Sequence, residues 1–208
     1  MMTFYMTPGS CSTGIHILLE ELELVFSAHV LNLPAGDGQQ PEYLAINPKG
    51  TIPTLVLDDG SALTEFAAIA WWLALRYPKR QLLPEAIADQ ARALEIISDV
   101  VGNIHGLGYT RIFTTERYLT READRAVVEN AGKVLVQKGL RRMADHLSSR
   151  EGPWCFEHFG IADAALFYVE FWADRIALSM PEPCQRHFQA MCARPVVRRV
   201  LMEEGYRV

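Results

Sequence analysis

Residues 7–15 of the chain, Thr-Pro-Gly-Ser-Cys-Ser-Thr-Gly-Ile, join a predicted β-strand to a predicted α-helix. The strand is expected at residues 2–6, where a Phe-Tyr pair favours extended backbone and the following Pro-Gly pair ends it. Apolar residues then recur at helical spacing, which predicts a helix over residues 11–23. Cys11 therefore falls in the first turn of the helix, where unpaired backbone N–H groups favour a thiolate and neighbouring hydroxyls make the turn polar. The alternative interpretation of Cys11 is a small buried apolar residue.

The composition is typical of a globular protein. Of the 208 residues, 50% are hydrophobic and 22% are charged, which supports a buried core and excludes wholesale disorder. The longest apolar run, residues 66–75, has ten residues, about half of the roughly 20 residues that a spanning helix needs. The start of the chain lacks the basic segment and long apolar core of a secretory signal. From the missing signal and the short apolar run we expect a cytoplasmic protein with no membrane partner. The net charge of −5 argues against nucleic acid as a main partner.

The four cysteines predict neither a metal site nor a disulfide framework. They lie at positions 11, 155, 184 and 192 and form no CxxC pair and no cysteine–histidine spacing of the zinc type. A reducing compartment would keep the thiols free. We expect Cys11 to be the most reactive of the four at neutral pH, because it alone lies at a polar helix start.

Charge and periodicity both divide the chain near residue 79. Residues 1–78 carry eight acidic and two basic side chains, a balance of −6, whereas the remainder has a balance of +1. After the first strand and helix, the first part predicts strands at 26–33, 54–57 and 61–63 and a helix at 65–77. The second part predicts helices at 86–104, 121–147, 161–178 and 183–202, the last broken near Pro195. We therefore expect an α/β domain containing a βαβ unit over residues 1–78, a linker over 79–84 and an all-helical domain over 85–208.

Four segments carry a resemblance to a known family. They are Tyr-Met-Thr-Pro-Gly-Ser-Cys-Ser at 5–12, Tyr-Leu-Ala-Ile-Asn-Pro-Lys-Gly-Thr-Ile-Pro at 43–53, Leu-Thr-Glu-Phe-Ala-Ala-Ile at 63–69 and Gly-Ile-Ala-Asp at 160–163. Over essentially its whole length the chain resembles the cytosolic glutathione transferases, most closely their bacterial, cysteine-containing beta-type group. The resemblance implies a thioredoxin-like domain that binds glutathione as co-substrate, followed by a helical domain. It also implies a role in detoxification and a homodimer in which the acidic first domain of one subunit packs on the helical domain of the other.

The resemblance assigns roles to residues of the first domain. It implies that Pro53 follows a cis peptide bond and that Ile52 offers its backbone N–H and C=O to the cysteine part of glutathione. Glu65 and Phe66, at the head of a helix, are expected to bind the γ-glutamyl end, the carboxylate of Glu65 meeting its ammonium. Phe66 replaces the Ser or Gly of the family, so only its main-chain N–H is available to a carboxylate at this helix N-terminus.

Positive charge for this ligand is scarce in the first domain. Glutathione is a net anion, but the loop at residues 34–40 contains no base, whereas similar bacterial proteins often have lysine there. Lys49 and the helix N-termini are the nearest positive features. We therefore expect Arg111 of the helical domain to meet a carboxylate of glutathione.

The leading functional hypothesis is transfer of glutathione to a hydrophobic electrophile. The glutathione thiolate would lie beside Cys11, stabilised by the helix N-terminus and by donors such as Ser10 and His105, a histidine that matches one facing the thiol in the beta-type group. The expected walls of the electrophile site are Tyr109, Ile112, Phe113 and Tyr118. Two alternatives stay open, namely one-cysteine thiol–disulfide exchange through Cys11 and a non-catalytic interaction protein that keeps the fold.

Overall fold

The computed structural model describes residues 1–207 and divides into two compact units. The first unit contains residues 1–82 together with the C-terminal segment that starts at Cys192, and the second contains residues 83–191. The four strands lie between Met2 and Thr64, and the elements that follow them are helices. The last helix, however, packs against the first helix of the chain, within the first unit.

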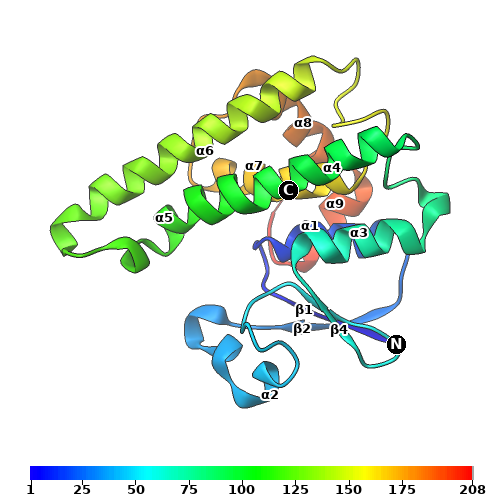
Figure 1. Cartoon of the computed structure of the whole chain (residues 1–208), viewed down its shortest axis with the longest axis horizontal. Coiled ribbons are helices and arrows are strands. Elements are labelled where there is room, and N and C mark those ends of the chain that lie inside the picture. The colour runs from blue at the N-terminus through cyan, green and yellow to red at the C-terminus, as the bar shows by residue number, and fades with distance from the viewer. Residues whose placement is uncertain (208) are drawn as a thin grey trace. The chain divides into compact units, whose positions relative to one another are not determined.

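A mixed four-stranded sheet forms the centre of the first unit, as predicted (Figure 1). Its strands are β1 (Met2–Met6), β2 (Phe26–Val30), β3 (Thr54–Val56) and β4 (Ala62–Thr64), in the order β2-β1-β3-β4. β1 runs parallel to β2 with Met2 opposite Phe26, and β3 runs antiparallel to both β1 and β4. β2 ends earlier than expected, because the Asn32 side chain accepts the Ala35 N–H and begins a turn.

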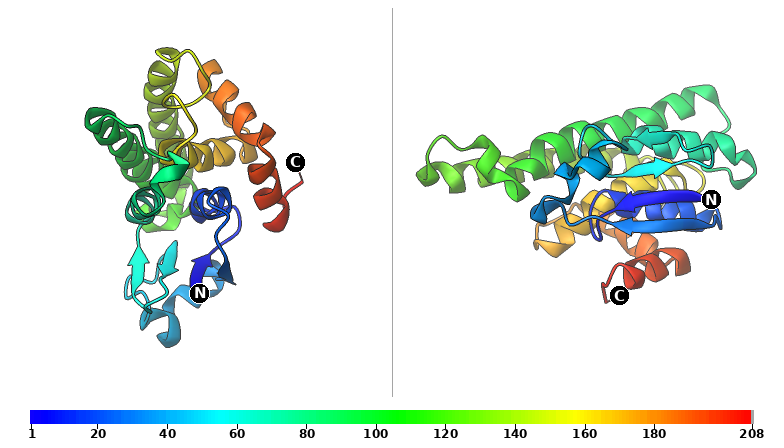
Figure 2. Two further views of the ribbon diagram at one scale, coloured as in Figure 1. Left: turned by 90° about the vertical axis from the view of Figure 1, so that its right-hand side faces the viewer. Right: turned by 90° about the horizontal axis from the view of Figure 1, so that it is seen from below.

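Four helices complete the first unit, namely α1 (Ser12–Glu21), α2 (Pro41–Leu44), α3 (Phe66–Arg76) and α9 (Pro195–Glu203). α1 and α3 pack together on one face of the sheet, and α2 lies on the other face (Figures 1 and 2). α9 contacts α1, and two ion pairs join their polar sides: Arg194 to Glu21 and Arg199 to Glu20, each with an N–O distance of 2.6 Å.

The second unit contains a long continuous helical run followed by three separate helices. The run comprises α4 (Ile87–Asp99), a π-helical segment (Val100–Tyr109) and α5 (Thr110–Phe113), and the others are α6 (Arg125–Ser148), α7 (Ile161–Arg175) and α8 (Glu182–Ala193). The run extends nine residues beyond the expected end at residue 104. Close packing on α6 holds this extension, since a Cβ at Gly108 would lie 2.7 Å from Cγ2 of Val136.

Short connections and a buried helix complete the description. Single 3-10 turns occur at Leu33–Ala35, Asp37–Gln39, Pro78–Arg80, Thr115–Tyr118 and Glu122–Asp124. α7 is buried along almost its whole length, and the Tyr109 hydroxyl donates to the Val169 carbonyl oxygen at 2.7 Å. Tyr109 is therefore a core residue, and its prediction as a wall of the electrophile site is wrong. Of the helices in residues 1–207, none combines the length and apolar character needed to cross a lipid bilayer.

Candidate active site

Two of the predicted site residues meet at the end of β1. Cys11 immediately precedes α1, and its thiol donates to the Ile52 carbonyl oxygen, with the sulfur 3.6 Å from the oxygen. The Ile52–Pro53 peptide bond is cis, as the resemblance implied. The fold thus brings the helix start and the proline loop together from positions 41 residues apart.

The protonation state of Cys11 differs from the prediction. The side chain is only 8% exposed, and this burial raises the pKa of the thiol from 9.0 to about 12, with the negative charge of Glu65 adding to the shift. The backbone N–H groups of Cys11 and Ser12 lower the pKa, but by less than burial raises it. The expected thiolate is therefore wrong for the free protein. Cys192 is more exposed than Cys11, which argues against the expected order of reactivity.

The hydroxyls of the turn are used to hold the turn itself. Ser10 Oγ lies 2.6 Å from Ser12 Oγ and accepts the Ser12 N–H at 3.1 Å. Ser12 Oγ in turn accepts the Thr7 N–H and donates to the Thr7 carbonyl oxygen, both at 3.1 Å. Ser10 is half-buried beside Cys11, so its first role is to fix the backbone that carries the thiol.

A residue from the far end of the chain also holds this turn. The carboxylate of Glu204, only 1% exposed, accepts the Gly9 N–H and the Thr13 hydroxyl at 2.7 Å each, and lies 2.9 Å from Nδ1 of His16. Gly9 has a φ of +69°, and a Cβ there would overlap the Tyr206 hydroxyl. The prediction missed Glu204. The available signal was the pair Thr13 and His16, two polar residues three positions apart in the first half of the helix.

A second buried network positions the loop before Pro53. The side-chain amide of Asn47, which is fully buried, donates to the Thr51 carbonyl oxygen at 2.8 Å and to Thr54 Oγ1 at 3.0 Å. The Tyr43 hydroxyl donates to the same carbonyl oxygen at 2.5 Å. The backbone on both sides of Ile52 is therefore anchored through buried hydrogen bonds.

The residues predicted to bind the γ-glutamyl end of glutathione lie at the start of α3. Glu65 precedes the helix with a φ of +74°, and Phe66, which is buried, begins it. The side chain of Lys49 is paired at this position. Its ammonium donates to Glu65 Oε1 at 2.5 Å and to Thr64 Oγ1 at 2.7 Å. Two residues that we expected to bind glutathione are thus bound to each other.

The other two predicted residues lie in the second unit. His105 lies in the π-helical segment with its Nδ1 3.4 Å from the Tyr168 hydroxyl and its ring 4.8 Å from that of Trp172. Burial lowers the pKa of His105 to about 4, so its ring is neutral at pH 7. Arg111, on α5, donates to the Leu107 carbonyl oxygen at 2.5 Å and stacks on the Tyr118 ring at 4.6 Å.

A buried ionic cluster in the second unit was not predicted. His187 lies between two carboxylates, with Nδ1 2.6 Å from Glu170 Oε2 and Nε2 3.2 Å from Asp163 Oδ1. Burial opposes a charge on His187, but the charge of Glu170 and the hydrogen bonds to both carboxylates outweigh burial and raise its pKa to about 10. Cys155, Asp163 and His187 have ligand atoms within 4.8 Å of one another, yet both ring nitrogens of His187 already face carboxylates, which favours a bound proton over a metal ion.

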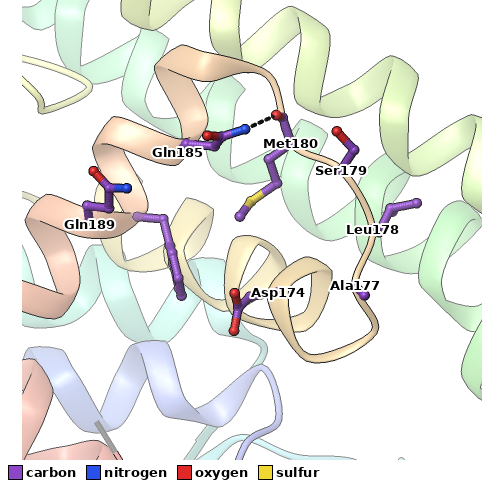
Figure 3. Close-up of a pocket in the computed structure, with 8 residues that line it drawn as sticks. Asp174, Ala177, Leu178, Ser179, Met180, Gln185 and Gln189 are labelled. Atoms are coloured by element: carbon purple, nitrogen blue, oxygen red, sulfur yellow. Dashed lines mark hydrogen bonds between the residues drawn. The ribbon is translucent and has the colours of Figure 1, made fainter.

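The second unit also has a pocket of about 480 Å³ at the end of α7 and the start of α8 (Figure 3). Eight residues line it, namely Asp174, Ala177, Leu178, Ser179, Met180, Gln185, Phe188 and Gln189. The Gln185 side chain donates to the Met180 carbonyl oxygen at 2.7 Å across one side. This pocket contains none of the residues predicted for glutathione binding, so it is a separate feature.

Family models, a curated relative and solved structures all match this chain to glutathione S-transferases. The family model described as Glutathione S-transferase, N-terminal domain, matches residues 9–76, and that for the C-terminal domain matches residues 121–201. Glutathione S-transferase GstA of Escherichia coli O157:H7 is 33% identical over 213 residues, covering 99% of this chain and 100% of the relative. A glutathione S-transferase from Xylella fastidiosa superposes with a TM-score of 0.90 at 26% identity, over 100% of both chains. A Sulfitobacter glutathione transferase homologue with bound glutathione superposes with a TM-score of 0.83 at 27% identity, over 98% of both chains.

The regions matched by the two family models contain the turn that carries Cys11, the cis-proline loop, the Glu65 start of α3 and helices α6, α7 and α8 of the second unit. The sheet order and the local geometry of the first unit therefore agree with matches that extend over nearly every residue. This chain belongs to the glutathione S-transferase family.

Proposed function

We propose that this glutathione transferase binds the tripeptide along the Ile52–Pro53 loop and adds its thiolate to an electrophilic carbon of a hydrophobic co-substrate. One observation carries the proposal: the thiol of Cys11 meets the backbone carbonyl of Ile52 beside a cis proline. The first unit therefore offers one edge at which a peptide could exchange backbone hydrogen bonds next to a sulfur donor.

In this proposal Cys11 acts as a hydrogen-bond donor and not as the nucleophile. Its high pKa keeps the proton on sulfur at neutral pH. When glutathione occupies the loop, its cysteine N–H donates to the Ile52 carbonyl oxygen, and the Cys11 S–H turns to the glutathione sulfur. The glutathione proton leaves to water, and the remaining thiolate forms the C–S bond as the leaving group departs from the electrophile.

The two ends of glutathione need charged partners. We assign the γ-glutamyl ammonium to Glu65 and its carboxylate to the main-chain N–H groups that begin at Phe66, at the positive end of the α3 dipole. Arg111 remains a candidate for the other carboxylate of the ligand, whereas the ammonium of Lys49 is paired with Glu65. Arg111 would have to leave the Leu107 carbonyl oxygen to take such a role.

We assign His105 a role as a neutral donor. In this proposal Nδ1 accepts from the Tyr168 hydroxyl, 3.4 Å away, and Nε2 carries the proton and donates it to the thiolate. Its low pKa argues against service as an acid that transfers a proton at pH 7. We propose that Ile112, Phe113 and Tyr118 line the site of the electrophile.

The alternatives are less well supported. Exchange through Cys11 requires its thiolate, and a pKa of about 12 leaves very little thiolate at neutral pH. A non-catalytic interaction protein is not favoured, given the match to GstA over 99% of the chain.

Two assays on the wild-type protein and Cys11→Ala test this assignment. One measures conjugation of glutathione to an activated chloronitrobenzene, and the other measures reduction of a mixed disulfide by glutathione. We expect conjugation to persist in Cys11→Ala at a reduced rate, with little disulfide exchange in either protein. Rapid disulfide exchange that disappears in Cys11→Ala would instead establish the exchange mechanism.

We further propose the beta-type subgroup, a cytoplasmic location, a role in detoxification and a homodimer. The presence of Cys11 at the helix start supports the subgroup, and the charge balance of −6 against +1 makes contact between unlike domains of two subunits electrostatically tolerable. Light scattering at micromolar concentration is expected to give twice the mass of one chain. A monomer would contradict the dimer.

A further inference from the structure

The ammonium of Lys49 is bound where the ligand's ammonium is expected. It donates to Glu65 Oε1 at 2.5 Å and to Thr64 Oγ1 at 2.7 Å, so it has two acceptors at the start of α3. The backbone of Lys49 is held separately, because its N–H donates to Asn47 Oδ1 at 3.2 Å in a turn closed by Gly50 at a φ of +63°. Only the flexible side chain therefore has to move to free Glu65.

The backbone of Glu65 has a positive φ, which is typical of residues at ligand sites. A φ of +74° is an uncommon conformation for a residue with a Cβ. Such conformations concentrate at ligand sites, where the surrounding structure enforces them. The carboxylate is 58% exposed, so a ligand can reach it from solvent.

Lys49 has no nearby basic neighbour in its part of the sequence. The only other base in residues 1–78 is Arg76, which lies at the opposite end of α3 and stacks on the Tyr77 ring at 5.5 Å. With Lys49 paired to Glu65, the first 78 residues offer an incoming ligand little positive charge at this end of α3. The pair thus satisfies Glu65 in the free protein and leaves the ligand to compete for it.

We propose that Lys49 is an internal stand-in for the α-ammonium of glutathione, which must displace it from Glu65 on binding. The inference rests on the proposed function of the same site. It makes Lys49 a residue that sets specificity: a ligand with an α-ammonium recovers the ion pair that it breaks, whereas a ligand without one gains nothing by displacing Lys49. Removing Lys49 therefore strengthens binding of the ammonium-bearing ligand.

Calorimetric titration of two ligands tests this role. The ligands are glutathione and its deaminated analogue, in which hydrogen replaces the α-amino group. The variants are Lys49→Met, which keeps the length of the side chain without its charge, and Thr64→Val, which removes the second acceptor but leaves the charge. Lys79→Met is the matched control, since it removes one lysine charge from the same unit at a distant turn.

We expect Lys49→Met to bind glutathione about two- to five-fold more tightly, the range typical of an exposed ion pair, with a smaller gain at high salt. The deaminated analogue should bind Lys49→Met no more tightly than the wild type. Thr64→Val should show a smaller gain of the same sign, and Lys79→Met should match the wild type.

Two other outcomes would each have a distinct meaning. If the wild type binds glutathione and Lys49→Met binds both ligands more weakly by the same factor, Lys49 is a carboxylate ligand and the inference is wrong. If the wild type itself fails to bind glutathione, the proposed function is wrong and the inference falls with it.

Discussion

The thiol of Cys11 shows how one buried side chain overrides its local sequence. A helix N-terminus stabilises a negative charge by about 0.3–1 kcal/mol, and by up to about 2 kcal/mol when partly buried. A pKa raised from 9.0 to about 12 corresponds to roughly 4 kcal/mol against the thiolate. Desolvation therefore outweighs the helix dipole. The sequence revealed the helix start but not the depth at which the sulfur would be buried.

Alkylation rates test the state of this thiol. With iodoacetamide at pH 7.5, we expect Cys192 to be labelled first, because it is the most exposed of the four cysteines, and Cys11 to react slowly. The Cys11 rate should rise about ten-fold per pH unit over the accessible alkaline range, since its thiolate fraction grows toward a pKa of about 12. Peptide mapping of the wild type and Cys192→Ala resolves the two sites. Preferential labelling of Cys11 at pH 7.5 would contradict the burial of its sulfur.

Some of the other site residues belong to a recognisable local motif and were predictable, and others do not and were missed. The family resemblance predicts the roles of Ile52, Pro53 and Glu65, and the cis peptide bond confirms the prediction for Pro53. Glu204 carries no such mark. Its partner Gly9 is 195 positions away, so only the folded chain brings its carboxylate to the turn.

The helix α1 depends on this distant carboxylate. Glu204 accepts the Gly9 N–H and the Thr13 hydroxyl and faces His16, so its removal would leave buried donors unpaired. We expect Glu204→Ala to lower the free energy of unfolding by about 3–5 kcal/mol and Glu204→Gln by about 1–3 kcal/mol, measured by urea denaturation.

The neighbouring Glu203→Gln is the matched control. Its carboxylate is 49% exposed and lies 3.5 Å from Nε2 of His16, so we expect a change within about 0.5 kcal/mol. Equal losses in Glu203→Gln and Glu204→Gln would show that the turn is not held by Glu204. Conjugation activity should fall with Glu204→Gln even where the protein remains folded, because the same turn carries Cys11.

The helical run from α4 to α5 continues past the end that the hydrophobic periodicity of the sequence predicts. Three glycines at 102, 106 and 108 lower intrinsic helix propensity, which explains the expected end at residue 104. In the structure these residues lie in the π-helical segment, and Gly108 allows close contact with Val136 of α6. Tertiary packing thus compensates for weak local propensity, and it buries Tyr109 instead of placing it in a binding site.

The architecture of the complete chain was largely predictable. Alternation of period two and of period 3.6 separates the α/β part from the helical part, and the charge balance changes at the same position. The return of α9 to the first unit was not predictable, because its ion pairs with α1 join residues more than 170 positions apart. The buried cluster of Asp163, Glu170 and His187 was hidden for the same reason, since its members lie on α7 and α8 and none forms a recognisable motif with another.

This buried cluster makes the stability of the protein depend on pH. The folded-state pKa of His187 is about 10, above the roughly 6.5 expected in the unfolded chain. The stabilisation is therefore complete below about pH 6.5 and is lost as the pH rises toward 10. Burial also raises the pKa of Glu170, which acts in the same direction. His105, with a pKa lowered to about 4, affects stability only below about pH 6.5 and does not interfere.

Urea unfolding from pH 7 to 9 measures this effect. Toward pH 9 the raised pKa values of the buried thiols of Cys11, Cys155 and Cys184 act in the same direction, because unfolded thiols begin to ionise near a pKa of about 8.5, so the slope between pH 7 and 8 reports on His187. We expect the free energy of unfolding to fall by about 1 kcal/mol per pH unit over that range. His187→Gln should be less stable than the wild type at pH 7, because it leaves two buried carboxylates without a cation, and its stability should change less with pH. A wild-type stability that stays constant from pH 7 to 9 would mean that His187 is neutral in the folded protein.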